Sequence, residues 1–370
     1  MRWDNLRTDA GAGDTDQTGT GQLPLAGIGH IGRGHGMAEV KTPEFRGITF
    51  YELHARSILN RVPGESAMPF RWTINPYRGC SHACVYCFAR NTHTYLGLDS
   101  GADFDNKIVV KVNAARLLAK ELSVASWQGE SIAMGTNVDP YQRAEGRYRL
   151  MRGLLSVLAE HRNPFSILTK GTLILRDLDL LTQAAEHTQV RVAISVGTTD
   201  RRIWRTSEPG TPSPVARLGV CRTLTDHGLG CGVLMAPILP FLSDSDEQLE
   251  QTVAAIARAG ATSVTPLPLH LRTGAREWYF RWLTEHHPQL VPRYERLYSR
   301  GAYVSRGYNE QLRRRVDRLA RRYGIRDRTE TSDSGSVQTS AARTSPQFAS
   351  FRNIRPNEER HNHQQQLALI

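Results

Sequence analysis

Six short runs of β-branched and other apolar residues, each followed by a longer stretch with helical spacing, constrain the fold of this chain most strongly. The pattern predicts strands at residues 71–76, 131–136, 165–170, 190–196, 232–238 and 263–269. It predicts helices at residues 113–124, 148–161, 175–186, 214–227, 246–259 and 275–286. Consecutive strand–helix units of this kind form a parallel sheet with right-handed crossovers.

The number of strand–helix units limits which parallel α/β architecture the chain can form. Six units are too few for a closed eight-stranded barrel. We therefore predict an α/β fold with a partial (β/α)6 barrel, and an open doubly wound sheet is the alternative. In both folds, ligands bind at the carboxyl ends of the strands.

The two ends of the chain lack this periodicity. Residues 1–43 are rich in Gly, Asp and Thr, and residues 329–370 in polar residues, so we expect a disordered arm and tail around a folded body at 44–328. No apolar stretch is long enough for a membrane span or a secretory signal, and we expect a cytoplasmic protein without membrane contact. The net charge of +11 favours a polyanionic partner, above all nucleic acid.

Three of the five cysteines, Cys80, Cys84 and Cys87, fall within eight residues. An odd and clustered set of cysteines argues against a disulfide framework and for metal ligation. The other two, Cys221 and Cys231, lie in apolar surroundings, and we expect them to be small core residues.

The C-x3-C-x2-C loop follows the first predicted strand directly. Three thiolates can each bind one iron of a [4Fe–4S] cluster and leave the fourth iron open to a ligand. The alternative is a zinc site that His82 or His93 completes. Zinc knuckles usually separate their ligand pairs more widely and need no preceding strand, so the spacing favours the cluster.

This loop, with Tyr86 just before the third cysteine, resembles the signature of the radical S-adenosylmethionine (radical SAM) superfamily. The resemblance implies a [4Fe–4S] cluster on Cys80, Cys84 and Cys87, with S-adenosylmethionine on the open iron. An electron from a reductant such as a flavodoxin or ferredoxin would then yield a 5′-deoxyadenosyl radical that abstracts hydrogen from a substrate. The alternative is a cluster- or zinc-bearing nucleic-acid-binding protein without radical catalysis.

Longer strings resemble the spore photoproduct lyase branch, the DNA repair photolyase-like radical SAM proteins. These strings are residues 55–60, the cysteine loop, residues 139–141, and residues 208–214 with Arg217. The resemblance implies that Thr136, Lys170 and Ser195, each near a strand end, bind S-adenosylmethionine, and that Tyr86 flanks its adenine. From the residues alone, Thr136 could equally serve a turn and Lys170 a solvated strand end.

The resemblance to the lyase breaks at two positions. In the lyase a cysteine immediately precedes the position of Thr136, and a tyrosine follows the third cluster cysteine. Here these positions hold Gly135 and Phe88. Both changes remove X–H groups from the expected radical relay, so we do not expect thymine-dimer repair by the same route. The substrate and the hydrogen donor are left open.

The basic segment at residues 311–323 has apolar residues at helical spacing and arginines on its other faces. We expect an amphipathic helix that packs on the barrel, with exposed arginines that can contact phosphates. Tyr294, Tyr298, Tyr303 and Tyr308 precede this segment. They could stack on bases, but placement in the core or at its rim is the favoured interpretation.

Overall fold

The fold is built around two sheets, which a computed structural model describes over residues 38–62 and 70–325. The larger sheet has seven strands in the order β11-β10-β9-β8-β7-β4-β3, and β3 (Leu59–Arg61) pairs antiparallel with β4 at one edge. The other strands are parallel: β4 (Trp72–Ile74), β7 (Ile132–Met134), β8 (Phe165–Thr169), β9 (Val190–Ser195), β10 (Cys231–Ile238) and β11 (Ser263–Pro268). All six predicted strands are confirmed.

The order of these strands decides between the two predicted architectures. The parallel strands follow one another in chain order, whereas a doubly wound sheet reverses its order at a switch point. Strands β3 and β11 are the two edges, so the sheet is open. The prediction of a partial (β/α)6 barrel is confirmed.

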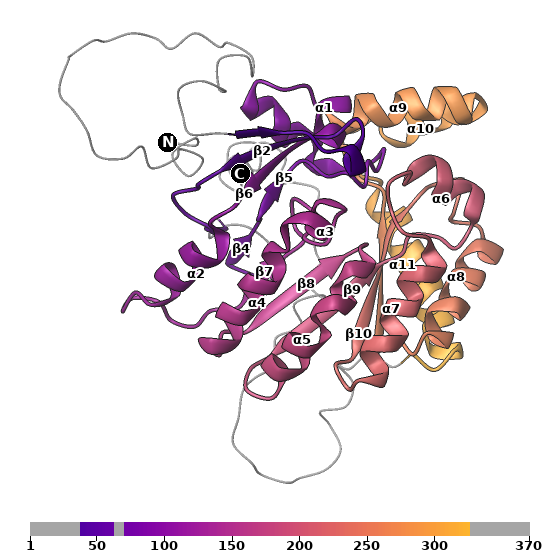
Figure 1. Ribbon diagram of the computed structural model, residues 1–370. Coiled ribbons are helices and arrows are strands. Elements are labelled where there is room, and N and C mark those ends of the chain that lie inside the picture. The colour runs from indigo at the N-terminus through magenta and orange to yellow at the C-terminus, as the bar shows by residue number, and fades with distance from the viewer. Residues whose placement is uncertain (1–37, 63–69, 326–370) are drawn as a thin grey trace.

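A helix follows each parallel strand at the predicted place. These helices are α2 (Ala114–Leu122), α4 (Leu150–Glu160), α5 (Leu178–Ala185), α7 (Pro214–Asp226), α8 (Asp246–Arg258) and α9 (Ala275–His286). Serine caps fix two of the starts, because Ser213 accepts the N–H of Ala216 and Ser245 accepts the N–H of Gln248. Figure 1 shows α4 and α5 side by side along the sheet.

A second, four-stranded sheet in the order β1-β2-β6-β5 was not predicted. It consists of β1 (Ala38–Val40), β2 (Thr49–Leu53), β6 (Lys107–Lys111) and β5 (Tyr77–Arg78). Figure 1 shows this sheet, in indigo, beside α1 at one end of the larger sheet. Its strands are short, and β2 pairs with β6 across more than fifty residues, so local periodicity does not reveal them.

The limits of the folded body differ slightly from the prediction. Strand β1 lies within the expected N-terminal arm and pairs with β2, so ordered structure starts before residue 44. Residues 1–37 of that arm and the expected tail at 329–370 lie outside the described residues. In the described part of the chain, no helix is both long and apolar enough to cross a membrane.

The remaining elements connect the two sheets and close the C-terminal side. They are α1 (Ala102–Asn106), α3 (Ala144–Tyr148), α6 (Arg201–Ser207), α10 (Val291–Leu297), α11 (Arg306–Arg322) and the 3-10 helices η3 (Pro43–Phe45), η4 (Phe88–Leu96), η5 (Thr172–Asp177) and η6 (Pro288–Leu290). The basic helix α11 begins earlier than predicted because Ser305 caps it. It buries Leu312 and Val316 and contacts α8, so its amphipathic packing is confirmed.

Two cysteines and two tyrosines considered in the sequence prove to be core residues. Cys221 and Cys231 are fully buried in the main apolar cluster, as predicted. Tyr294 and Tyr298 are also buried, and their hydroxyls donate to the backbone oxygens of Pro240 and Leu269. These two tyrosines therefore stabilise the C-terminal side and are not available to stack on bases.

Candidate active site

The cysteine loop leaves the small sheet at the end of β5. Gly79 has φ +79°, and a Cβ there would lie 2.9 Å from the backbone oxygens of Phe104 and Lys107. Only glycine therefore fits this turn. The next residue, Cys80, donates its N–H to the Phe104 oxygen at 2.9 Å. Strand β6 and the segment before it thus fix where the loop begins.

A buried arginine holds the middle of the loop. Arg90, fully buried in η4, donates from Nε and Nη2 to the Cys84 oxygen at 3.1 and 2.9 Å. Its Nη1 donates to the Gly101 oxygen at 2.8 Å, and its Nη2 lies 2.8 Å from a carboxylate oxygen of Asp105. The planar guanidinium thus ties the loop to α1. Sequence analysis gave Arg90 no role.

The three loop thiols are sheltered from solvent. Cys80 and Cys84 are buried and Cys87 is half-buried, and none is in a disulfide. Burial raises the pKa of each thiol, because a thiolate is poorly solvated there. Thiolates in this loop would therefore need a cationic partner, such as a bound metal.

The two histidines considered as zinc ligands have other contacts. His82 Nδ1 lies 3.3 Å from Asp139 Oδ2, and His93 Nε2 is 2.9 Å from the Lys107 oxygen. Burial lowers the pKa of His93 to about 4, so its imidazole is neutral. Over residues 38–62 and 70–325, no three His, Cys, Asp or Glu side chains converge on a point that would hold a single metal ion.

The ends of β8 and β9 bring two predicted cofactor ligands together beside the loop. Lys170 Nζ donates to Ser195 Oγ at 2.7 Å, and Ser195 Oγ donates to the Ala236 oxygen at 3.0 Å. The same ammonium lies 5.8 Å from the centre of the Tyr86 ring. Three of the four predicted cofactor residues therefore share one place.

Thr136, the fourth predicted residue, follows the neighbouring strand β7. Its hydroxyl is buried and has no hydrogen-bond partner among the described residues. A buried hydroxyl without a hydrogen-bond partner lowers the stability of the folded state. A bound ligand would satisfy this group, which fits a cofactor with amino, carboxylate and ribose groups.

A buried chain of charges, absent from the sequence prediction, orients Tyr86. The Tyr86 hydroxyl donates to Glu208 Oε1, and Arg217 Nη2 donates to Glu208 Oε2 at 2.5 Å. Arg217 Nη1 also donates to the Ser195 oxygen at 2.7 Å. Although burial opposes ionisation, Arg217 and Lys170 keep the pKa of Glu208 below its ordinary value. Glu208 and Arg217 were recognised only as parts of a resembling string.

Asp139 ties the loop after β7 to the end of β8. It accepts hydrogen bonds from Thr169 Oγ1 at 2.5 Å, Lys170 N at 2.7 Å and Tyr141 N at 2.9 Å. Burial alone would raise the pKa of Asp139, but His82 and the hydrogen bonds from Lys170 and Thr169 outweigh burial and lower it to about 2. The carboxylate therefore positions the backbone that carries Lys170.

The two departures from the lyase have different surroundings. Gly135 has φ +91°, and a Cβ there would lie 2.8 Å from the carbonyl carbon of Leu168 and closer still to its oxygen. No side chain fits at this position. Phe88 is 46% exposed, and the Arg272 guanidinium lies 5.6 Å from its ring centre and 5.8 Å from that of Tyr303.

Comparison with known proteins agrees with this geometry. Residues 74–256 match the radical SAM superfamily. An uncharacterized protein of Mycobacterium tuberculosis is 49% identical over 325 residues, which cover 88% of this chain and 93% of the relative. An uncharacterized protein of Methanocaldococcus jannaschii is 28% identical over 207 residues, 55% of this chain and 73% of the relative.

Solved structures of spore photoproduct lyase share the fold. One mutant of that enzyme has a TM-score of 0.57 at 18% identity, over 75% of this chain and 80% of the lyase chain. A second mutant, solved with bound AdoMet and dinucleoside spore photoproduct, has a TM-score of 0.57 at 17% identity, over 74% and 79%. With the family match, the cysteine loop and the partial barrel in agreement, this chain belongs to the radical SAM superfamily of enzymes.

Proposed function

We propose that Cys80, Cys84 and Cys87 bind a [4Fe–4S] cluster and that the adjoining strand ends bind S-adenosylmethionine. The observation that carries this proposal is the position of Lys170, whose ammonium contacts both Ser195 and the face of Tyr86. Lys170 therefore contacts both the cysteine loop and the carboxyl end of a barrel strand, and parallel α/β folds bind their ligands at these strand ends.

The side chains divide the binding of this cofactor between them. Lys170 provides a compact positive charge for the carboxylate of S-adenosylmethionine. Thr136 offers its unpartnered hydroxyl, and Ser195 holds the Lys170 ammonium in place. Tyr86, fixed by Glu208, presents an oriented aromatic face for the adenine.

The bound group supplies chemistry that amino acids cannot supply. When reduced, the cluster with S-adenosylmethionine provides a 5′-deoxyadenosyl radical for hydrogen abstraction. The chain's own part is to hold the reactants and to keep water out of a site whose loop residues are largely buried. The electron would come from a reductant such as a flavodoxin or ferredoxin in the cytoplasm.

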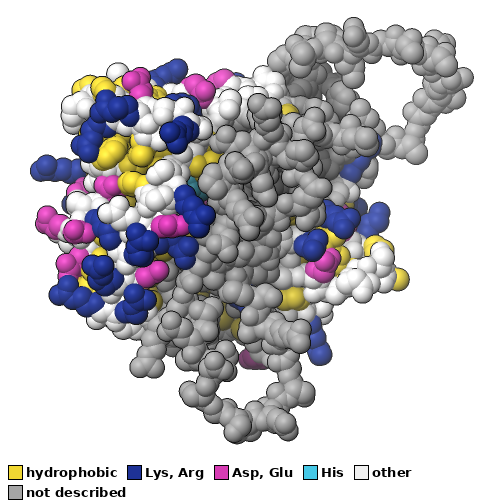
Figure 2. Space-filling view, turned by 180° about the vertical axis from the view of Figure 1, so that it is seen from behind, with side chains coloured by type: hydrophobic (Ala, Val, Ile, Leu, Met, Phe, Trp, Pro, Cys, Tyr) yellow, Lys and Arg dark blue, Asp and Glu magenta, His cyan; other side chains and the backbone are white. Residues whose placement is uncertain are grey.

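For the substrate, we propose nucleic acid, acted on by a DNA repair photolyase-like enzyme. The net charge of +11 supports a polyanionic substrate. Beside the loop, the guanidinium of Arg272 lies over the rings of Phe88 and Tyr303. This combination of aromatic rings and positive charge suits the stacking of unpaired bases. Figure 2 shows that, on the face opposite Figure 1, the visible basic side chains are interspersed with acidic ones.

Anaerobic reconstitution with iron and sulfide tests the cluster. The wild-type chain is expected to bind iron and sulfide and to gain broad visible absorbance, and Cys84→Ala is expected to lose both. Cys221→Ala is the matched control, because this buried cysteine lies in the core and should leave iron binding unchanged. Zinc without iron in the purified wild type, or full iron loading of Cys84→Ala, would contradict the proposal.

Release of 5′-deoxyadenosine after reduction with dithionite tests the second cofactor. Lys170→Met is expected to keep its iron and lose most S-adenosylmethionine binding and cleavage, whereas Lys120→Met, an exposed change on α2, should behave as wild type. Addition of single-stranded or damaged DNA is expected to stimulate the release. Stimulation by a peptide or a small metabolite instead would redirect the substrate assignment.

A further inference from the structure

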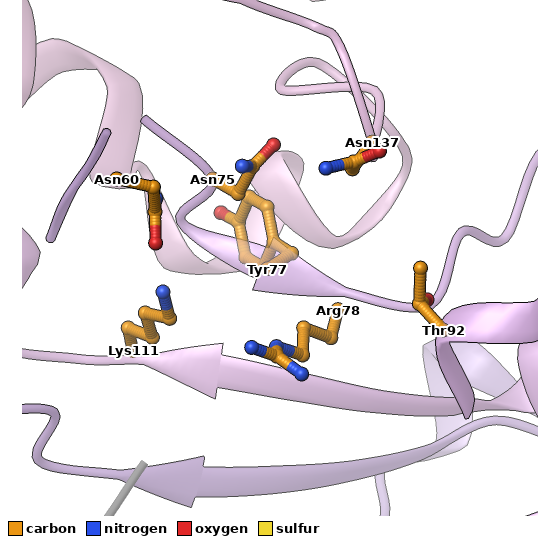
Figure 3. A pocket seen from close by; sticks show the side chains of 7 residues that line it. All are labelled: Asn60, Asn75, Tyr77, Arg78, Thr92, Lys111 and Asn137. Atoms are coloured by element: carbon orange, nitrogen blue, oxygen red, sulfur yellow. The ribbon is translucent and has the colours of Figure 1, made fainter. Parts of the chain in front are cut away.

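A polar pocket lies beside the cysteine loop and has no part in the function proposed above. Figure 3 shows the side chains that line it. Its lining comes from both sheets, from the loop after β7 and from η4: Asn60, Asn75, Tyr77, Arg78, Thr92, Lys111 and Asn137. None of the three loop cysteines lines the pocket.

Two buried cations face the pocket from adjacent strands. Arg78 on β5 pairs in register with Val109 on β6, and Lys111 lies two residues further along β6. Because side chains alternate along a strand, Arg78 and Lys111 point to the same face. Arg78 is only 9% exposed and Lys111 only 1% exposed. Figure 3 shows Arg78 and Lys111 on the same side of the pocket, across from Asn60 and Asn75.

Neither cation forms an ion pair within residues 38–62 and 70–325. The charge of Glu121 raises the pKa of Lys111, but Glu121 forms no ion pair with it. Its carboxylate oxygens instead accept hydrogen bonds from the N–H groups of Ile58 and Leu59 at 2.9 and 2.8 Å. Two buried like charges without a counter-charge are costly to fold. A ligand that brings a negative charge would offset this cost.

The charge and the hydrogen-bonding groups favour one class of ligand. A carboxylate would neutralise only one of the two cations, whereas a phosphate dianion would neutralise both. A guanidinium also binds phosphate oxygens in a bidentate manner, and an ammonium adds a point charge. The buried Oδ1 of Asn75 has no partner among the described side chains, so it would accept a hydroxyl of the same ligand.

The titration of Lys111 agrees with an anionic ligand. Burial and the neighbouring Arg78 lower the pKa of Lys111 to about 7, and Glu121 opposes them only in part. A bound dianion would reverse this effect and keep the ammonium charged.

We propose that this pocket is a phosphate site that takes either inorganic phosphate or the terminal phosphate of a nucleotide. Arg78 and Lys111 bind the phosphate oxygens, and Asn75 accepts a hydroxyl of the ligand. The site goes beyond the proposed radical chemistry, and it can be occupied whether or not S-adenosylmethionine is bound.

Calorimetric titration of the reconstituted full-length chain at constant ionic strength tests this proposal. The separate ligands are inorganic phosphate, a nucleoside 5′-monophosphate and acetate. Phosphate and the nucleotide are expected to bind, and Lys111→Met is expected to weaken both at least about tenfold, since it removes one charged hydrogen-bond donor. Lys120→Met, an exposed lysine, is the matched control and should bind as wild type.

The relative affinities identify the source of the phosphate. Tighter binding of the nucleotide assigns the site to a nucleotide, and equal or weaker binding assigns it to free phosphate. As a variant-free measurement, phosphate should raise the melting temperature of the wild type more than acetate does. Unchanged binding in Lys111→Met, acetate binding as tight as phosphate, or no binding of either phosphate ligand would overturn the proposal. Because binding is measured without reductant, it is independent of radical catalysis.

Discussion

Restoring a side chain at Gly135 is the change whose outcome the structure predicts most directly. The lyase resemblance invites Gly135→Cys as a way to install a hydrogen donor. The backbone there has φ +91°, and a Cβ would lie 2.8 Å from the carbonyl carbon of Leu168, well inside van der Waals contact of about 3.5 Å. Adopting the left-handed conformation costs about 1–2 kcal/mol, and overpacking adds about 1–3 kcal/mol. We therefore expect Gly135→Ala and Gly135→Cys to destabilise the chain by about 2–5 kcal/mol.

Urea unfolding followed by circular dichroism measures this loss. The matched control is Gly219→Ala on α7, where an added Cβ meets no atom within 4 Å. A helical alanine there should be stabilising by about 0.5–1 kcal/mol. Because β7 must move away from β8 to admit any side chain, S-adenosylmethionine cleavage should fall in both Gly135 variants. A Gly135→Ala chain as stable as wild type would refute the steric reasoning.

Three further changes test the buried charges. Arg90→Lys keeps the charge but loses the fork that holds the Cys84 oxygen, so iron content after reconstitution should fall and unfolding should require less urea. Glu208→Gln leaves Arg217 buried without its ion-pair partner, and we expect a loss of about 3–5 kcal/mol with weaker S-adenosylmethionine binding; an unchanged dissociation constant would contradict the role of Tyr86. Between pH 7 and 10.5 the native Lys111 binds fewer protons than the unfolded one, so the unfolding free energy should rise with pH in this window. Lys111→Met should remove that rise and stabilise the ligand-free chain at pH 7 by about 4 kcal/mol, measured by urea unfolding across pH.

The parallel barrel could be predicted because its strands are buried on both faces. Such strands appear as continuous apolar runs that end at Gly, Pro or Thr, and the helices between them carry caps such as Ser245. The small sheet has no comparable pattern. Strand β6 (Lys107–Lys111) begins and ends with lysine and is paired by β2 (Thr49–Leu53), far away in the sequence. Its existence depends on tertiary pairing, which local periodicity does not encode.

The same distinction applies to the site. The cysteines were predicted from their spacing, and Lys170 and Ser195 from their positions near strand ends together with the family resemblance. The contact that orients Tyr86 comes from Glu208, 122 residues further along the chain. No local signal connects these two residues. At Gly135 the sequence shows that a thiol is missing, but only the backbone geometry shows that no side chain fits.

The buried and half-buried cations around the cysteine loop are of two kinds, which differ in whether a carboxylate pairs with them. Arg90 and Arg217 each form an ion pair with a buried or half-buried carboxylate, so their charge is already neutralised and their task is to hold the loop and Tyr86. The half-buried Lys170 donates to the hydroxyl of Ser195 and shares the negative charge of Glu208 with Arg217, whereas the buried Lys111 has no ion pair among the described residues. A buried cation that the fold leaves uncompensated is stabilised when an anion binds. The placement of Lys170 against the Tyr86 ring and of Lys111 in the neighbouring pocket therefore predicts two separate anion sites near the cysteine loop, one for a carboxylate and one for a phosphate.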